Sequence, residues 1–204
     1  MTSIFADIDL STFWAQSQWA DKEYVEDAPT QEMIRSVEEE LGYKLPAAYI
    51  ELMKTQNGGK PANDSYRTNV RTSWSDDHVS VTGIKGIGRE KTWSLCGNLG
   101  SQQLIDEWGY PAIGVYFGDC PSAGHDMLCL DFRACGPNGE PSVVHVDQEF
   151  DYKITFLAEK FEAFVRGLEP SEAFDDEDVI DGAPKPMVSA EAPPMQRPWW
   201  RFWR

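Results

Sequence analysis

Residues 29–59 constrain the fold more than any other stretch, because they contain two helix starts and two helix stops. Thr30 is predicted to cap a first helix, which Gly42 ends in the left-handed conformation that glycine tolerates. Leu45-Pro46 restarts a helix with proline in its permitted first turn. The stop of the second helix is assigned to three residues with turn preferences, Asn57, Gly58 and Gly59. The stretch therefore predicts a helical hairpin.

Both predicted helices carry an apolar stripe at the spacing of one helical face. The stripe of the first consists of Met33, Ile34, Val37 and Leu41, and that of the second of Leu45, Tyr49, Leu52 and Met53. Two short amphipathic helices cannot bury such stripes by themselves. A sheet is therefore expected to cover them.

The second half of the chain supplies short apolar runs that are typical of strands. Residues 112–117, 127–132 and 143–146 are separated by segments rich in Gly, Pro, Asn and Asp, which predicts a meander-like antiparallel sheet. Residues 153–168 return to helical spacing and predict a closing helix. The fold class expected is α+β, a mainly antiparallel sheet packed against the N-terminal helical hairpin and a C-terminal helix.

The composition divides the chain into three parts. Residues 1–28 form an aromatic arm that is expected to pack on the domain, residues 29–169 form the domain, and residues 170–204 form an acidic, Pro- and Ala-rich tail. The tail ends in WWRFWR, with Trp199, Trp200 and Trp203. This motif favours docking onto the chain itself, another copy or a partner over contact with a membrane interface.

The formal net charge of −16 argues against nucleic acid or an anionic membrane as direct ligands. Without residues 170–204, which hold seven acids and four bases, 27 acids and 14 bases remain, so residues 1–169 carry −13. This charge favours a basic partner, although excess acid is also an ordinary route to solubility. Neither a membrane span nor a secretory leader is apparent, and the four cysteines lack C-x-x-C spacing. A cytoplasmic protein with reduced thiols is expected.

Catalytic motifs are weak. His78, His125 and His145 stand near several aspartates, which leaves a small metal-dependent hydrolase as an alternative, but H-E-x-x-H and H-x-H are both absent. No G-x-S-x-G marks a nucleophile, and no lysine-serine or lysine-threonine pair follows the glycines at 83, 86 and 88. We therefore expect no catalytic residues, no metal and no cofactor.

Several motifs in fixed order resemble the SUKH superfamily, which includes bacterial immunity proteins and the fungal cell-wall assembly regulator. They are T-x-E-M-I-x-x-V-E-x-E-L-G-Y-x-L-P-x-x-Y-x-x-L from Thr30, N-G-G at residues 57–59, I-G-V-Y-F-G-D at residues 113–119, C-L-D-F at residues 129–132 and F-E-x-F at residues 161–164. The resemblance covers residues 19–168. It implies a non-enzymatic domain that binds and neutralises a cognate protein toxin, often a nuclease or a nucleic-acid deaminase.

The resemblance also implies roles for individual residues. Asn57, Gly58 and Gly59 would be structural, whereas the partner-binding cleft would contain Gly118, Asp119 and Asp131. Asp126, in the acidic turn after Asp119, is a further candidate for partner binding. A basic toxin suits an acidic surface, because such a surface can imitate the polyanion that the toxin attacks. A regulatory scaffold that recruits partners through its tail is the remaining alternative.

Overall fold

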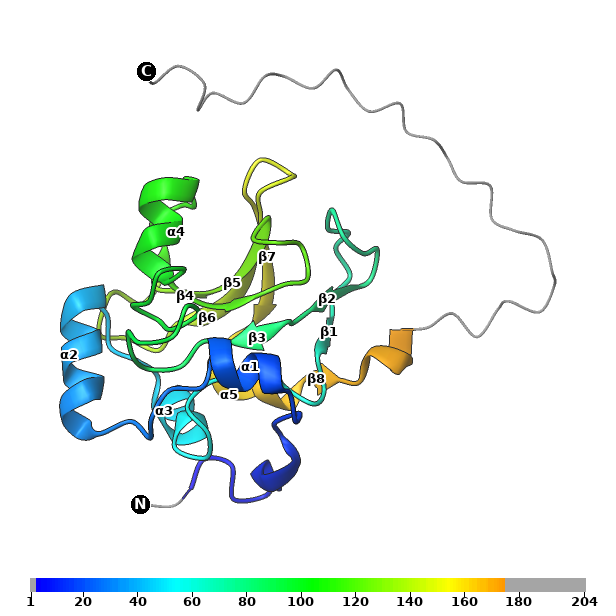
Figure 1. Cartoon of the computed structure of the whole chain (residues 1–204). Helices are drawn as coiled ribbons and strands as arrows, with labels where there is room; N and C mark the ends of the chain where they lie inside the picture. The colour runs from blue at the N-terminus through cyan, green and yellow to red at the C-terminus, as the bar shows by residue number, and fades with distance from the viewer. Residues whose placement is uncertain (1–2, 175–204) are drawn as a thin grey trace, which may run out of the picture.

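The computed structural model describes residues 3–174 and has an α+β fold, as predicted (Figure 1). The central sheet has five antiparallel strands in the order β3-β4-β5-β6-β7, and a smaller sheet has the order β2-β1-β8. The strands are β1 (Ser65–Arg67), β2 (His78–Ser80), β3 (Gly83–Ile84), β4 (Gly114–Asp119), β5 (Asp126–Asp131), β6 (Ser142–Asp147), β7 (Lys153–Ala158) and β8 (Leu168–Glu169). The helices are η1 (Leu10–Thr12), α1 (Gln18–Glu23), α2 (Gln31–Leu41), α3 (Ala47–Met53), α4 (Ser101–Trp108), α5 (Phe161–Arg166) and η2 (Ser171–Phe174).

The helical hairpin forms as α2 and α3. The Thr30 hydroxyl accepts a hydrogen bond from the Met33 amide at 3.1 Å, and Gly42 ends α2 with φ of 76°. The predicted end of the second helix is wrong, because α3 stops at Met53. Asn57 instead forms an isolated antiparallel bridge with Glu26, and Gly59 forms one with Ile84.

Helices cover both faces of the central sheet, which explains why β4 and β5 are buried along their whole lengths. Alternate residues of these strands enter two separate cores. Val115, Phe117, Leu128 and Leu130 belong to the larger core together with residues of α2, α3 and α5. Tyr116, Met127 and Cys129 belong to the smaller core, which Leu104 of α4 completes.

The predicted helix over residues 153–168 is only half correct. Residues 153–158 form β7, which pairs with β6, and only residues 161–166 form a helix, α5. β-branched Ile154 and Thr155 favour a strand, and pairing with β6 satisfies the backbone groups there. The apolar residues at helical spacing therefore belonged to two elements.

The N-terminal arm lies against the domain, with Phe5 and Tyr24 buried. Its hydrogen bonds include that from the Trp14 indole nitrogen to the Thr55 hydroxyl, at 3.0 Å. The predicted tail motif of Trp199, Trp200 and Trp203 lies outside the described residues. Within residues 3–174, no helix combines the length and the apolar character needed to cross a membrane.

Candidate functional site

Three buried carboxylates gather at one end of the central sheet. Asp119 ends β4, Asp126 begins β5 and Asp147 ends β6, so the antiparallel order brings them to the same end, where Asp126 pairs with Asp147 across the ladder. Their exposed fractions are 4%, 2% and 1%. Burying a carboxylate costs free energy unless the group is paired, so the partners of these three side chains indicate the role of this end of the sheet. We call it the carboxylate end.

Asp119 connects the carboxylate end to the N-terminal arm. The Tyr24 hydroxyl, next to the end of α1, donates a hydrogen bond of 2.8 Å to Asp119 Oδ1. Burial raises the pKa of Asp119 and lowers the pKa of Lys85, while the attraction between their charges opposes both shifts. Lys85 is itself buried, and its ammonium group donates to the Leu99 carbonyl and lies 4.7 Å from the centre of the Trp93 ring.

Asp147 anchors two surface loops. It accepts hydrogen bonds from the amide and the hydroxyl of Ser73, at 2.7 and 2.8 Å, and from the Phe150 amide at 3.3 Å. Ser73 lies in the β1–β2 connection and Phe150 in the β6–β7 turn. One buried side chain therefore fixes the positions of both loops.

Asp126 pairs with His145 of β6 at 2.9 Å between Oδ2 and Nε2. Cys120, directly after β4, completes a buried group in which one sulfur, one carboxylate oxygen and one ring nitrogen all lie within 4.8 Å of one another. Burial, together with the charges of Asp126, Asp119 and Asp147, raises the pKa of the Cys120 thiol well above its ordinary value. A protonated, inaccessible thiol is a poor nucleophile.

The structure does not bring all the predicted partner-binding residues together. Gly118 and Asp119 lie in β4 and Asp126 starts β5, but Asp131 ends β5 and so lies at the opposite end of the strands. All four are buried, so their contact with a partner stays a prediction. Gly118 is needed for packing, since an added Cβ would lie 3.0 Å from the Gly83 carbonyl oxygen.

Asp131 is held by Arg133, whose Nε and Nη2 donate to both of its oxygens at 2.5–3.1 Å. Burial acts to raise the pKa of Asp131, but the hydrogen bonds and charge of Arg133 outweigh it and lower the pKa. A lowered pKa means that ionised Asp131 stabilises the fold at neutral pH, and that this contribution is lost as the pH falls through the folded-state pKa.

We expect Asp131→Asn to reduce the free energy of unfolding at pH 7 by about 1 kcal/mol, a value discounted because Arg133 is half exposed. Urea titrations of both proteins should converge as the pH falls below about 3, where the wild-type carboxylate is protonated. Glu39→Gln, on an exposed part of α2, serves as the control. A pH-independent difference would contradict the role of the ion pair.

Asn57 connects three segments from a buried position. Its side-chain amide donates to the carbonyls of Asp27 and Ile87 at 2.6 and 2.9 Å, and its Oδ1 accepts from the Ile87 amide at 2.7 Å. Gly58, with φ of 98°, brings its backbone so close to Tyr24 that an added Cβ would lie 2.6 Å from the Tyr24 carbonyl oxygen. Gly59 pairs with Ile84 of β3.

Three loops extend above the carboxylate end, and we call them the rim: residues 69–77, 121–125 and 148–152. The Gln148 amide donates to the His125 carbonyl, which joins two of these loops, and the ammonium group of Lys153, at the start of β7, donates to the Arg71 carbonyl of the third. In the described chain, the three non-glycine residues with positive φ all lie in the rim: Ala123, Asp151 and Tyr152. Backbone conformations of this kind often accompany functional loops.

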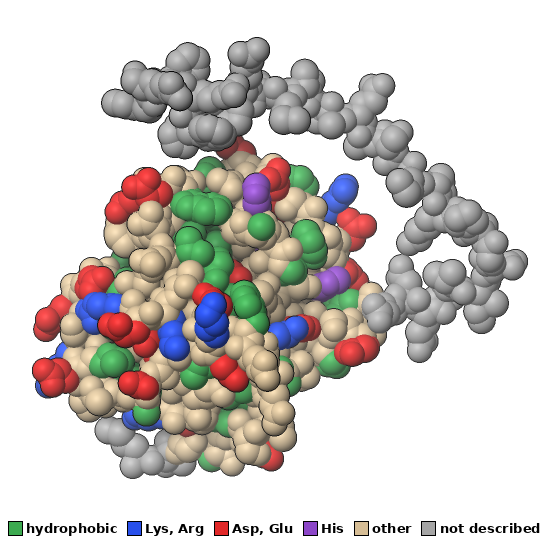
Figure 2. Space-filling model, in the orientation of Figure 1, with side chains coloured by type: hydrophobic (Ala, Val, Ile, Leu, Met, Phe, Trp, Pro, Cys, Tyr) green, Lys and Arg blue, Asp and Glu red, His purple; other side chains and the backbone are tan. Residues whose placement is uncertain are grey.

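The rim exposes aromatic and acidic side chains together. Trp74 is 55% exposed and Phe150 41% exposed. The same loops expose four acids, namely Asp76, Asp77, Glu149 and Asp151. Figure 2 shows hydrophobic, acidic and histidine side chains side by side on the upper part of this face, where Figure 1 places the loops beyond β2 and β7. An exposed aromatic pair of this kind is a feature of protein interaction surfaces.

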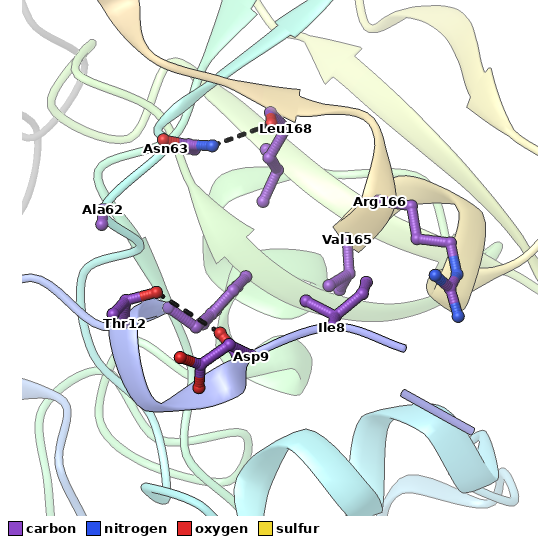
Figure 3. A pocket seen from close by; sticks show the side chains of 9 residues that line it. Ile8, Asp9, Thr12, Ala62, Asn63, Val165, Arg166 and Leu168 are labelled. Carbon is purple, nitrogen blue, oxygen red and sulfur yellow. Dashed lines mark hydrogen bonds between the residues drawn. The ribbon is translucent and has the colours of Figure 1, made fainter. Parts of the chain in front are cut away.

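A separate hollow of about 220 Å³ lies between the arm and α5 (Figure 3). Ile8, Val165 and Leu168 supply its apolar wall, and Asp9 and Arg166 stand at its border. The polar groups there have partners within the chain: Asn63 donates to the Leu168 carbonyl, and Arg166 pairs with Asp7 and Glu162. The hollow therefore lies at the contact between the arm and the domain. Among the described residues, it brings no set of catalytic groups together.

The histidines do not form the site that a hydrolase needs. His125 is exposed and pairs with Glu149, His78 pairs with Asp77, and His145 is buried. The glycines at 83, 86 and 88 pack against Tyr24, Asn57 and Glu26, respectively. A Cβ atom added to any of these glycines would lie within 2.5 Å of its neighbour. Their role is close packing.

The comparison with family models decides the affiliation. A model described as SUKH_6, SMI1-KNR4 cell-wall, matches residues 31–165. The chain belongs to this SUKH family. Membership is consistent with an immunity or cell-wall-related role. No curated protein matches the sequence. The matched range contains the whole carboxylate end but leaves out Tyr24 and Glu26, so the arm supplies the SUKH domain with buried partners from outside that range.

Proposed function

We propose that this SUKH protein is an immunity-type protein that binds a cognate protein toxin through the rim and neutralises it by occlusion. The observation that carries the proposal is the exposed pair Trp74 and Phe150, set among acids on loops that Asp147 fixes from below. Rigid, exposed aromatic side chains are the residues from which interface hot spots are built.

Charge supports a basic toxin that acts on nucleic acid. Residues 1–169 carry −13, and the rim that contains Trp74 and Phe150 also exposes Asp76, Asp77, Glu149 and Asp151. An acidic surface accelerates association with a basic active site and is repelled by nucleic acid itself. In this proposal the chain carries no catalytic residue, and the buried carboxylates act as internal supports for the surface that binds.

The test is co-expression of the full chain with the toxin domain encoded beside its gene, scored by cell survival and by the Kd of the purified pair. We expect protection by the wild type, and loss of protection with a Kd increased about tenfold or more for Trp74→Ala/Phe150→Ala. Phe156→Ala is the matched control, because Phe156 is equally exposed on β7 outside the rim. The Kd should rise with salt concentration.

Protection by the rim double variant at wild-type strength would refute this surface. If the chain failed to bind that toxin at all, the immunity role itself would be wrong. Binding that survives removal of the rim side chains but disappears with residues 170–204 would favour the regulatory scaffold instead.

A further inference from the structure

The buried group Cys120, Asp126 and His145 has the composition of a metal site. Cys120 directly follows β4, Asp126 begins β5 and His145 lies within β6, and each is at most 3% exposed. One donor atom of each lies within 4.8 Å of the other two. Zinc ligands stand about 3.3–3.7 Å apart around the ion, so only small side-chain rotations separate this group from a coordinating arrangement.

Two atoms of this group that could coordinate a metal, Asp126 Oδ1 and His145 Nδ1, are buried without a hydrogen-bond partner. The bond between the two residues uses only the other oxygen and the other nitrogen. An unsatisfied buried donor or acceptor costs free energy that native proteins seldom leave unrecovered. A cation coordinated by the group would recover it.

The charges around the group also favour a cation. Asp119 has the Tyr24 hydroxyl and the charge of Lys85, and Asp147 has three donors from the rim. For the Asp126 carboxylate, in contrast, His145 is the one side-chain hydrogen-bond partner in the described structure. Asp126 therefore has fewer compensating partners than the other two carboxylates of this end.

We propose that Cys120, Asp126 and His145 bind one Zn²⁺, which clips the end of β4 to the beginning of β5 and to β6. Sulfur, imidazole nitrogen and carboxylate oxygen together are ligands of zinc, whereas Mg²⁺ and Ca²⁺ require oxygen ligands. A bound zinc ion holds a coordinating thiol as the thiolate, whatever its affinity for protons in the free protein. The site is closed to substrates and is therefore structural.

The fourth ligand position falls to a water molecule or to Thr155. Thr155 lies opposite His145 in the β6–β7 ladder, is buried, and its hydroxyl also lacks a hydrogen-bond partner. His145 and Thr155, on the adjacent strands β6 and β7, therefore each contribute a buried polar atom without a hydrogen-bond partner. This inference does not depend on the proposed toxin binding.

The experiment measures metal in the full chain, purified without chelators from zinc-containing medium. Elemental analysis should give roughly one zinc per chain, and removal by a strong chelator should lower Tm by about 5 °C or more, with recovery on adding zinc. Cobalt added to the metal-free protein should produce a thiolate-to-cobalt charge-transfer band and intense visible bands typical of tetrahedral coordination.

Matched variants assign the ligands. Cys120→Ser should abolish the charge-transfer band and His145→Gln should lower cobalt affinity at least tenfold. The controls Cys129→Ser, a buried thiol of the smaller core, and His125→Gln, an exposed histidine, should bind as the wild type does. If Cys120→Ser fails to fold, retention of the band in Cys129→Ser and Cys96→Ser/Cys135→Ser assigns it to Cys120, because the chain has four cysteines.

A wild-type protein that contains no stoichiometric metal and shows only the spectrum of aqueous cobalt would overturn the proposal. So would undiminished binding by Cys120→Ser. Either result would leave Asp126 and His145 as an internal ion pair.

Discussion

Asn57→Ala is expected to lower the free energy of unfolding by about 3–4 kcal/mol, a large fraction of the stability of a domain of this size. The alanine removes two donated hydrogen bonds and one accepted one, all in the interior. It also leaves the amide and the carbonyl of Ile87 buried without those partners. The cost therefore contains the desolvation of backbone groups as well as the lost bonds.

Urea unfolding monitored by tryptophan fluorescence measures this effect. Asn138→Ala, in the exposed β5–β6 connection, is the control and should change stability by less than about 0.5 kcal/mol. Asn57→Asp distinguishes the accepted hydrogen bond from the two donated ones. Its carboxylate can still accept from the Ile87 amide, but it faces two carbonyl oxygens where the asparagine donates. It should be at least as destabilising as alanine. A loss below about 1 kcal/mol in both variants would show that the connection is not needed.

Asp147→Asn is expected to lower the free energy of unfolding by about 2 kcal/mol and to weaken toxin binding about tenfold. An asparagine has nearly the same size but only one acceptor oxygen, and its amide group would face a donor of Ser73. The β1–β2 connection, which contains Trp74, then loses its attachment to β6. The effect on binding comes from less pre-organisation of the loop.

Titration calorimetry with the toxin domain and urea unfolding measure the two effects on the same preparations. Glu149→Gln removes a neighbouring but exposed carboxylate and should leave stability unchanged. Ser73→Ala removes one of the three hydrogen bonds and should give an intermediate result for both quantities. A stability loss with unchanged binding would separate the anchor from the partner surface and would contradict a binding role for residues 69–77.

The elements with local signals were predictable. Thr30, Gly42 and the apolar stripe are sufficient to place α2, because a cap, a stop and a periodicity all act within a few residues. The boundary between β7 and α5 was missed because the apolar residues from Ile154 to Leu168 suit both a strand followed by a helix and one helix. Pairing with β6, a partner distant in sequence, decides between them.

The carboxylate end could be predicted only in part. Asp119 and Asp126 stood out in the sequence as acids in a turn-like segment, but their burial depends on what covers the sheet end, which no local pattern encodes. The sequence did not indicate that Tyr24, Ser73 and Lys85 lie beside the buried carboxylates. Each of them is at least 34 positions away in sequence from the aspartate with which it interacts. The one available signal was Lys85, a charge within the otherwise apolar and glycine-rich segment at residues 83–88.

The long-range attachments of the arm have a consequence for synthesis on the ribosome. Arg166 donates to Asp7 across 159 positions, and Tyr24 reaches Asp119 across 95. These two contacts can therefore form only after most of the domain has left the exit tunnel. Until then Tyr24, which is buried in the folded protein, lacks its partner Asp119, so burial of this tyrosine reports that β4 is in place.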